Sequence, residues 1–108
     1  RESLLVLDEQ MRVITANRRF YDTFQTRPEE TEGHSLFELG NNQWDIPGLR
    51  KLLAEIRSQH KTFEDYRVEH PFPDIGFKQM LLNGRHLQEA DKNAGRILLA
   101  IEDVTPTK

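Results

Sequence analysis

A helical stripe of apolar residues lies between two blocks of strand-like sequence, and this order restricts the possible folds more than any other feature. Leu49, Leu52, Leu53 and Ile56 recur at the i, i+3, i+4, i+7 spacing of one buried helix face. The strand-like segments are 3–8 and 12–17 before the helix, and 62–72, 77–89 and 95–105 after it. Helices segregated between two strand blocks predict an α+β fold around one antiparallel sheet.

The first two strand-like segments predict a β-hairpin, because a short turn-forming stretch, Asp8–Met11, separates them. Asn17 follows the second segment and has a side chain typical of a helix N-cap. Phe20 and Phe24, four residues apart, give the next helix one aromatic edge for the core. We therefore expect the hairpin to lead directly into a short helix.

The composition narrows the class of protein. The 108 residues suit one domain, and 36% apolar against 31% charged residues allow a modest core under a strongly solvated surface. Lys and Arg are interleaved with Asp and Glu at a net charge of −3, so we expect no nucleic-acid partner. No apolar run is long enough to cross a bilayer, and we expect no direct membrane contact. The absence of cysteine excludes disulfides, thiolate zinc sites and thiol chemistry.

The sequence lacks the motifs of the common catalytic classes. It contains no phosphate-binding glycine loop, no nucleophile elbow around a serine and no zincin pair of histidines. The adjacent acids Glu29 and Glu30 fit a helix start, where the helix dipole favours negative charge. Glu102 and Asp103 fit the end of a strand. We therefore expect that the domain is not an enzyme.

The histidines do not have the spacing of metal ligands, and we expect no metal site. Glu69 and His70 are adjacent on a predicted strand, so they point to opposite faces. His70 shares its face with Tyr66. It is either a core histidine with satisfied hydrogen bonds or a pocket residue that binds a ligand or titrates. The four histidines are His34, His60, His70 and His86.

Two further side chains each admit two interpretations. Trp44 is the only tryptophan and lies where the polar loop "GNNQWDIP" turns into the helix. It either plugs the core beneath Leu49 and Leu53, or gates a cavity between that helix and the sheet. Asn83 interrupts the strand-like stretch "MLLNGRHL". Its amide is either satisfied by a bulge at Gly84 or presented to a ligand.

Several stretches, in this order, resemble a PAS domain. The opening is "LLVLDEQMRVITANRRFYDTFQTRPEETEGHSLFEL", in which the strand "VITAN" leads into a helix with two phenylalanines. The end, "ILLAIEDVT", is similar to the last PAS strand with its Asp-x-Thr exit motif, Asp103 to Thr105. "GNNQWDIPGLRKLL" and "FEDYRVEHPFPDIGFKQMLLNGRHL" look like bacterial PAS domains attached to sensor histidine kinases and chemotaxis methyltransferase hybrids. The resemblance covers nearly the whole chain.

The resemblance implies a PAS fold: a five-stranded antiparallel sheet with short helices and one longer helix on one face. Residues 1–108 would form a single PAS sensory domain, a piece of a longer multidomain signalling protein. The resemblance also implies a cytoplasmic input domain of a bacterial two-component system, covalently linked to an effector such as a histidine kinase. PAS–PAS contacts would make a homodimer. The signal would leave through Asp103 and Thr105, whose alternative role is merely to end the strand.

Two functions stay open on this basis. In the first, the domain binds a small molecule in its core and relays the change to the effector. In the second, large side chains fill the core, and the domain is a ligand-free dimerisation or interaction module. The last strand carries Ile97 and Leu99 on one face and Leu98 and Ala100 on the other, and this second apolar face fits the second function.

The expected pocket lies between the longer helix and the sheet. Its candidate lining residues are selected by the face of the predicted helix or strand on which each lies, together with the resemblance to PAS domains. They are Phe24, Phe37, Trp44, Leu49, Leu53, Tyr66, His70, Met80, Leu82, Asn83 and Leu99.

We expect no resident cofactor in this pocket. The cysteine that forms a flavin adduct in LOV-type PAS domains is absent, which excludes that photochemistry. Haem needs an axial ligand, often histidine, and the apolar stripe of the longer helix contains none; His60 follows at its end. Trp44 and Asn83 could flank a non-covalent flavin ring, but no spacing in the sequence requires one.

Overall fold

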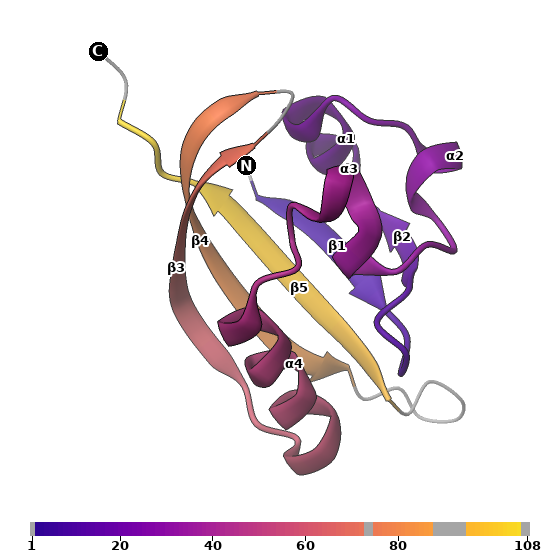
Figure 1. Cartoon of the computed structure of the whole chain (residues 1–108). Helices are drawn as coiled ribbons and strands as arrows, with labels where there is room; N and C mark the ends of the chain where they lie inside the picture. Colours follow the sequence, from indigo (N-terminus) through magenta and orange to yellow (C-terminus); the bar gives the residue numbers. More distant parts are fainter. Residues whose placement is uncertain (1, 73–74, 88–94, 107–108) are drawn as a thin grey trace.

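The computed structural model describes residues 2–72, 75–87 and 95–106, which form a five-stranded antiparallel sheet with helices packed on one face (Figure 1). This arrangement confirms the predicted α+β class. The strands are β1 (Ser3–Leu7), β2 (Val13–Ala16), β3 (Phe63–Phe72), β4 (Gly76–Leu87) and β5 (Arg96–Asp103). The helices are α1 (Arg18–Phe24), α2 (Pro28–Thr31), the 3-10 helix η1 (Leu36–Glu38), α3 (Leu39–Asn42) and α4 (Pro47–Gln59).

The first and last strands pair at the centre of the sheet, whose strand order is β2-β1-β5-β4-β3. Their register places Ser3 opposite Ile101 and Leu5 opposite Leu99. The predicted hairpin of β1 and β2 is confirmed. Residues 88 and 89, predicted as the end of the second long strand, lie outside the described residues. The central pairing brings the two ends of the chain to the same edge of the core.

Asn17 caps α1 as predicted, and it also fastens that helix to the sheet. Its side-chain oxygen accepts hydrogen bonds from the backbone N–H of Phe20 and of Leu4, each at 3.0 Å. Its amide nitrogen donates to the carbonyl of Glu2 at 3.0 Å. One side chain therefore fixes how α1 leaves the hairpin.

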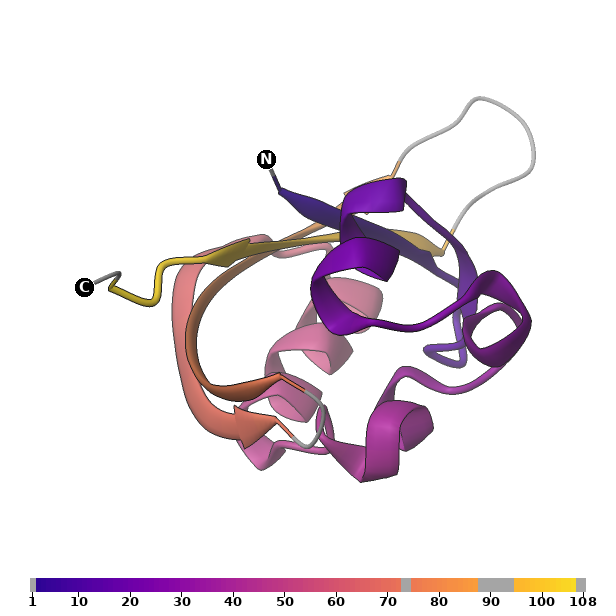
Figure 2. The same cartoon turned by 90° about the horizontal axis from the view of Figure 1, so that it is seen from above.

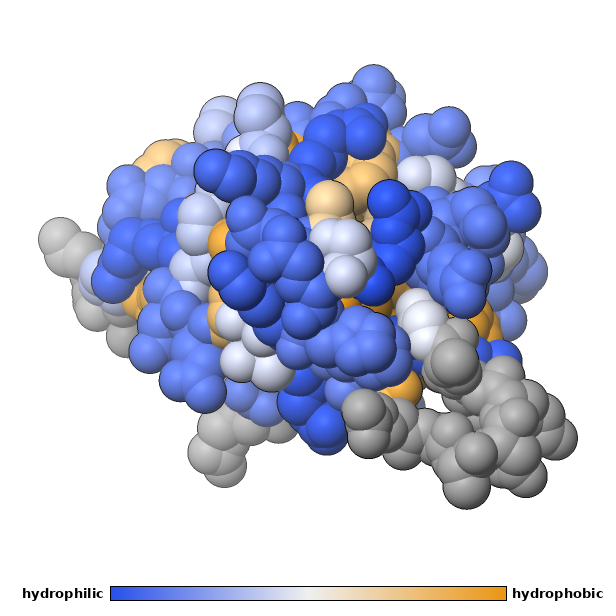
Figure 3. Space-filling model, turned by 90° about the horizontal axis from the view of Figure 1, so that it is seen from below, coloured by the Kyte–Doolittle hydropathy of each residue, from blue (hydrophilic) through white to orange (hydrophobic). Residues whose placement is uncertain are grey.

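The predicted apolar stripe of α4 faces the sheet. Leu49, Leu53 and Ile56 are buried, and Leu52 is half-buried at the margin of the interface. The sheet curves around the helices, which gather on its concave side (Figure 2). The end of the molecule where α4 finishes has a mostly hydrophilic surface with small, separated apolar areas (Figure 3). The apolar residues of the longer helix thus pack into the core and do not form an exposed patch at this end.

Strand alternation decides which face of the sheet meets this core. Along β4, Met80, Leu82 and Gly84 are buried, and along β5 the same holds for Ile97, Leu99 and Ile101. Their neighbours in the sequence point to the convex face, as the two-residue period of a strand requires. Among the described residues, no helix covers that convex face.

Candidate functional site

Trp44 lies at the centre of the core and has no solvent exposure. Its ring centroid is 5.4 Å from that of Phe24 and 5.2 Å from that of Phe72. Phe24 in turn lies 5.0 Å from Phe20 on the same face of α1. These edge-on and tilted contacts have the spacing that aromatic pairs favour. Trp44 is therefore a core side chain in an aromatic cluster between α1 and β3, whereas the plug interpretation had placed it beneath Leu49 and Leu53.

The indole N–H of Trp44 is buried, and no other described residue accepts a hydrogen bond from it. A buried donor without an acceptor costs on the order of 1–3 kcal/mol. Gly40, Asn41 and Asn42, the last three residues of α3, form an irregular loop-like turn with left-handed backbone conformations, with φ of 54°, 64° and 62°. Glycine and, less often, asparagine adopt this conformation as single residues, so three such residues in succession are unusual. An unpaired donor thus follows directly after a strained loop.

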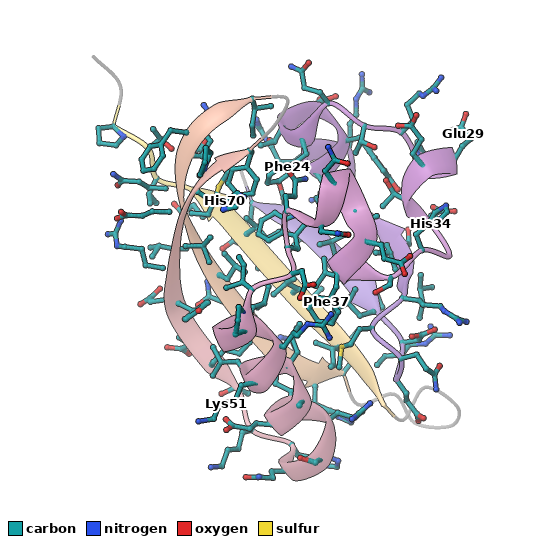
Figure 4. All side chains as sticks on the ribbon, viewed as in Figure 1. Phe24, Glu29, His34, Phe37, Lys51 and His70 are labelled. Atoms are coloured by element: carbon teal, nitrogen blue, oxygen red, sulfur yellow. The ribbon has the colours of Figure 1, made fainter. Side chains whose placement is uncertain are left out.

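Most of the predicted pocket residues come together in this core. Phe24 and Phe37 point inward between the helices and the sheet, whereas Glu29, His34 and Lys51 point outward (Figure 4). The buried members of the set are Phe24, Phe37, Trp44, Leu49, Leu53, Met80, Leu82 and Leu99.

Tyr66 and His70 are half-buried on the core side of β3. Tyr66 packs edge-on against Phe63, with ring centroids 6.3 Å apart. The His70 ring lies 5.0 Å from that of Phe72, which joins His70 to the aromatic cluster. Both side chains border the core without reaching its centre.

Asn83 does not belong to this set, because it points to the convex face of the sheet. Its side-chain oxygen accepts a hydrogen bond from the backbone N–H of Asp65 at 3.0 Å. Asp65 has a left-handed conformation, with φ of 58°, inside a bulge of β3 between Phe63 and Tyr66. A bulge does satisfy the amide, but the predicted location at Gly84 was wrong. A flavin ring flanked by Trp44 and Asn83 does not fit, since the sheet separates the two side chains.

Gly84 lies opposite that bulge, and a larger residue at this position would clash with its neighbours. A Cβ atom at Gly84 would come within 2.6 Å of the Phe63 ring and 2.9 Å of the Ile56 side chain. Real Cβ atoms do not approach heavy atoms so closely. Glycine therefore allows α4 and the start of β3 to close over β4.

The predicted exit residues, Asp103 and Thr105, bind the tail of the chain to β4. The Thr105 hydroxyl accepts a hydrogen bond from the Gln79 N–H at 2.8 Å, and the Thr105 N–H donates to Asp103 at 2.9 Å. The Val104 N–H donates to the Gln79 carbonyl at 2.8 Å. The second oxygen of the Asp103 carboxylate lies 3.9 Å from the Lys78 ammonium. The chain thus leaves the sheet in a fixed direction.

One cluster was missed at the sequence level. The Arg50 guanidinium donates to the Asp45 carboxylate and lies 4.1 Å over the Phe37 ring. The hydrogen bond from Arg50 lowers the pKa of Asp45, and the same contact raises the pKa of Arg50. An acid before a helix and an arginine five residues later is a signal from which this pair could have been predicted.

Two hollows border the aromatic cluster. The first, of about 340 Å³, lies at the end of the sheet beneath α1, next to Ser3, Phe24 and Ile101. The second, of about 240 Å³, lies between α1 and the loop that precedes Trp44, next to Leu39 and Gln43. Each of the two has a mouth to solvent and a floor in the core.

The described residues do not form a metal-binding cluster. No three His, Asp or Glu side chains among them converge on one point. His60 sits in the left-handed cap at the end of α4, and its ring stacks on that of His86 at 4.3 Å. It is therefore remote from the buried face of α4, where an axial haem ligand would be needed. Nor is any described helix both long enough and apolar enough to cross a membrane.

A family model described as "PAS fold" matches residues 1–108. No curated protein matches the sequence. Among solved structures, the VqmA dimer of Vibrio cholerae superposes with a TM-score of 0.82 at 13% identity, over 97% of this chain and 47% of that one. The chain thus spans about half the length of VqmA.

Two further structures cover more of their own chains. A sensory box sensor histidine kinase from Vibrio cholerae gives a TM-score of 0.76 at 16% identity, over 99% of this chain and 84% of that one. The LOV domain of a blue-light activated histidine kinase from Erythrobacter litoralis gives 0.74 at 18% identity, over 96% of each chain. At these identities the similarity concerns the fold.

Proposed function

The chain belongs to the PAS-fold family, and from this premise we propose that it is a non-catalytic sensor domain of a bacterial signalling protein. In this proposal residues 1–108 are one input domain, located in the cytoplasm and covalently linked to an effector such as a histidine kinase. A small molecule binds in the core, and the change reaches the effector through Asp103 and Thr105. The sensor histidine kinase among the structural neighbours supports this assignment by analogy.

The attachment of the tail to β4 is the observation that carries the proposal. Asp103 and Thr105 lie at the end of β5, whose residues Leu99 and Ile101 face the core. A shift of β5 relative to β4 changes the geometry of the bond between the Gln79 N–H and the Thr105 hydroxyl. Two packings of the core would therefore hold the tail in two ways, and a ligand would select one by its differential affinity.

The unpaired indole N–H of Trp44 indicates what such a ligand contributes. A small molecule with a hydrogen-bond acceptor gains the bond that the described core leaves unmade. The strained loop at Gly40–Asn42 is the natural place for the core to open, since its backbone gives up strain when it rearranges. Trp44 then acts as both plug and gate. A neighbouring structure is described as VqmA bound to DPO, so a ligand is known in a protein of this fold.

Nuclear magnetic resonance tests both halves of the proposal, because the single indole N–H has a resonance of its own. A screen of small molecules with acceptor groups should yield a binder that shifts the Trp44 signal and the amide signals of Gln79 and Thr105 together. In the Thr105→Val variant, the Trp44 shift should persist while the Gln79 response is lost. A binder that moves Trp44 but leaves Gln79 and Thr105 unchanged in the wild type would contradict the relay.

A second function is favoured by a different observation, the apolar convex face of the sheet. Its central side chains are half-buried within one chain, and no described helix covers them. With the core filled by Trp44 and its neighbours, the domain would act as a ligand-free dimerisation module. VqmA, which has a domain of this fold, forms a dimer. The apolar side chains of the convex face are Leu4, Val6, Leu81, Leu98 and Ala100.

A further inference from the structure

The hollow of about 340 Å³ beneath α1 is built from four segments that are separated in the sequence. Its floor is apolar and consists of Phe24, Met80 and Ile101, which are 4%, 0% and 2% exposed. The volume is at the lower end of the range for small-molecule sites. The hollow shares Phe24 and Met80 with the predicted core pocket, whereas Ser3, Arg19 and Thr23 belong to the hollow and not to that set.

Hydrogen-bonding groups surround this floor and are not used elsewhere in the described structure. Ser3 is only 3% exposed and borders the hollow, and Thr23 borders it from α1. Neither hydroxyl makes a hydrogen bond to another described residue. Arg19 lies at the mouth, and none of the ion pairs among the described residues includes it. The Ser3 and Thr23 hydroxyls therefore border the hollow without a protein partner and can bind a ligand there.

Two acids, Glu102 and Asp103, also line the hollow, and neither forms an ion pair with Arg19 in the described structure. The Asp103 carboxylate is held by the Thr105 N–H at 2.9 Å and by Lys78 at 3.9 Å. The Glu102 side chain points to the convex face of the sheet, because it alternates with the buried residues of β5. There it borders another hollow, next to Leu4. Arg19 is thus the positive charge of the hollow that no described acid pairs with, and a guanidinium binds carboxylates in bidentate geometry.

We propose that this hollow binds a small monocarboxylate with an apolar body. The carboxylate pairs with Arg19 and accepts from the hydroxyls of Ser3 and Thr23, and the hydrocarbon part lies on Met80 and Ile101. The site goes beyond the core pocket of the proposed function and does not depend on it. Because the hollow borders the last residues of β5, its ligand would act on the strand that holds the tail.

Hexanoate and hexanamide are suitable probes, since they differ in charge and little in shape. Met80 lies in the floor of the hollow, whereas Met11 lies in the core beside the hairpin turn, outside the lining residues. In protein labelled at the methionine methyl groups, hexanoate should shift the Met80 signal in a saturable way and leave Met11 unchanged. Hexanamide should bind at least about tenfold more weakly, as expected for loss of a charged hydrogen bond.

Two matched variants test the role of Arg19. Arg19→Gln should weaken hexanoate binding about tenfold. Arg18→Gln should leave it unchanged, because the Arg18 side chain is 92% exposed and faces Asp22 instead. Both arginines are on the surface, and an unchanged amide spectrum verifies folding of each variant.

Three outcomes would overturn this proposal. They are the absence of a Met80 shift at saturating hexanoate, equal binding by Arg19→Gln, and a shift of the Trp44 indole signal without one at Met80. The last of these would support the core pocket of the proposed function. Conversely, a Met80 shift with an unperturbed Trp44 would establish the site in the hollow and leave the core pocket to its own test.

Discussion

Asn17 shows how much one polar side chain can organise in a small domain. Its side-chain oxygen accepts hydrogen bonds from two backbone N–H groups, one in α1 and one in β1. Its side-chain nitrogen donates to a carbonyl before β1. The sequence predicted only the contact within the helix, because N-capping is a local property. The bonds to Leu4 and Glu2 join residues that are 13 and 15 positions away.

Replacing Asn17 by alanine should therefore cost more than the loss of an ordinary cap. We expect the free energy of unfolding to fall by about 2 kcal/mol or more, since a typical cap contributes about 1 kcal/mol and two further bonds are lost. Urea denaturation measures the change. Asn17→Asp keeps the accepting oxygen and should lose less. A loss below about 0.5 kcal/mol in Asn17→Ala would show that water replaces these bonds.

The contact between Asp45 and Arg50 predicts a dependence of stability on pH. The hydrogen bond from Arg50 lowers the pKa of Asp45 in the folded protein. The contribution is therefore complete above the unfolded pKa of about 3.9 and is lost as the pH falls through the lower folded value. The urea midpoint of Asp45→Asn should lie below that of the wild type near neutral pH, and the two should converge in acid.

Arg50→Gln is the partner control for this experiment. The difference in urea midpoint between the wild type and Arg50→Gln should also shrink in acid. It should not reach zero, because the contact of Arg50 with the Phe37 ring is lost at every pH. If the difference between wild type and Asp45→Asn stayed the same at all pH values, Asp45 would act through packing and not through its charge.

At the scale of the elements, the contact of α4 with β3 and β4 depends on Gly84. The bulge in β3 turns Phe63 over this glycine, and Ile56 of α4 meets the same point. The sequence showed a glycine next to Asn83 and suggested a bulge in its own strand. The bulge lies instead in the paired strand, because the side chain that needs the space belongs to Phe63.

Gly84→Ala should lower the free energy of unfolding by about 1–3 kcal/mol, the usual range for overpacking a core. The added methyl group forces Phe63 or Ile56 away from its present position. The reason can be tested by a double-mutant cycle with Phe63→Val, which removes the ring. The cost of Gly84→Ala should be smaller in that background. Additive effects would contradict steric crowding by Phe63.

At the scale of the whole molecule, the convex face of the sheet is the surface whose role the single chain leaves undecided. Leu98 of β5 lies opposite Val6 of β1 and Arg85 of β4, near the middle of this face. Apolar side chains gathered in this way on an uncovered surface favour association. This face separates the dimerisation function from a purely ligand-driven sensor.

If the dimerisation function holds, the chain should sediment as a dimer, and Leu98→Lys should convert it to a folded monomer whose thermal midpoint no longer depends on protein concentration. A lysine in the middle of a closed apolar interface is costly because its charge loses water. Ala54→Lys adds the same charge on the exposed side of α4 and should leave the dimer intact. A wild-type monomer at all concentrations would overturn the dimerisation function.

The sequence by itself determined the order and type of the elements. The period of Leu49, Leu53 and Ile56 indicated α4 and its buried face, and five strand-like segments indicated the number of strands. Such features depend on residues that are close together in the chain, and the spacing of their apolar side chains indicates a helix or a strand directly. The turn of Asp8–Met11 and the cap at Asn17 are local in the same sense.

Only the tertiary structure decided which side chains meet. Asn83 faces away from Trp44 because its register in β4 sends Met80 and Leu82 to the core. The hollow at Arg19 exists because the pairing of β1 with β5 brings Ser3 opposite Ile101. These contacts join residues that are far apart in the sequence, so no local period predicts them. The energy that selects them comes from burying one continuous core, which is a property of the whole chain.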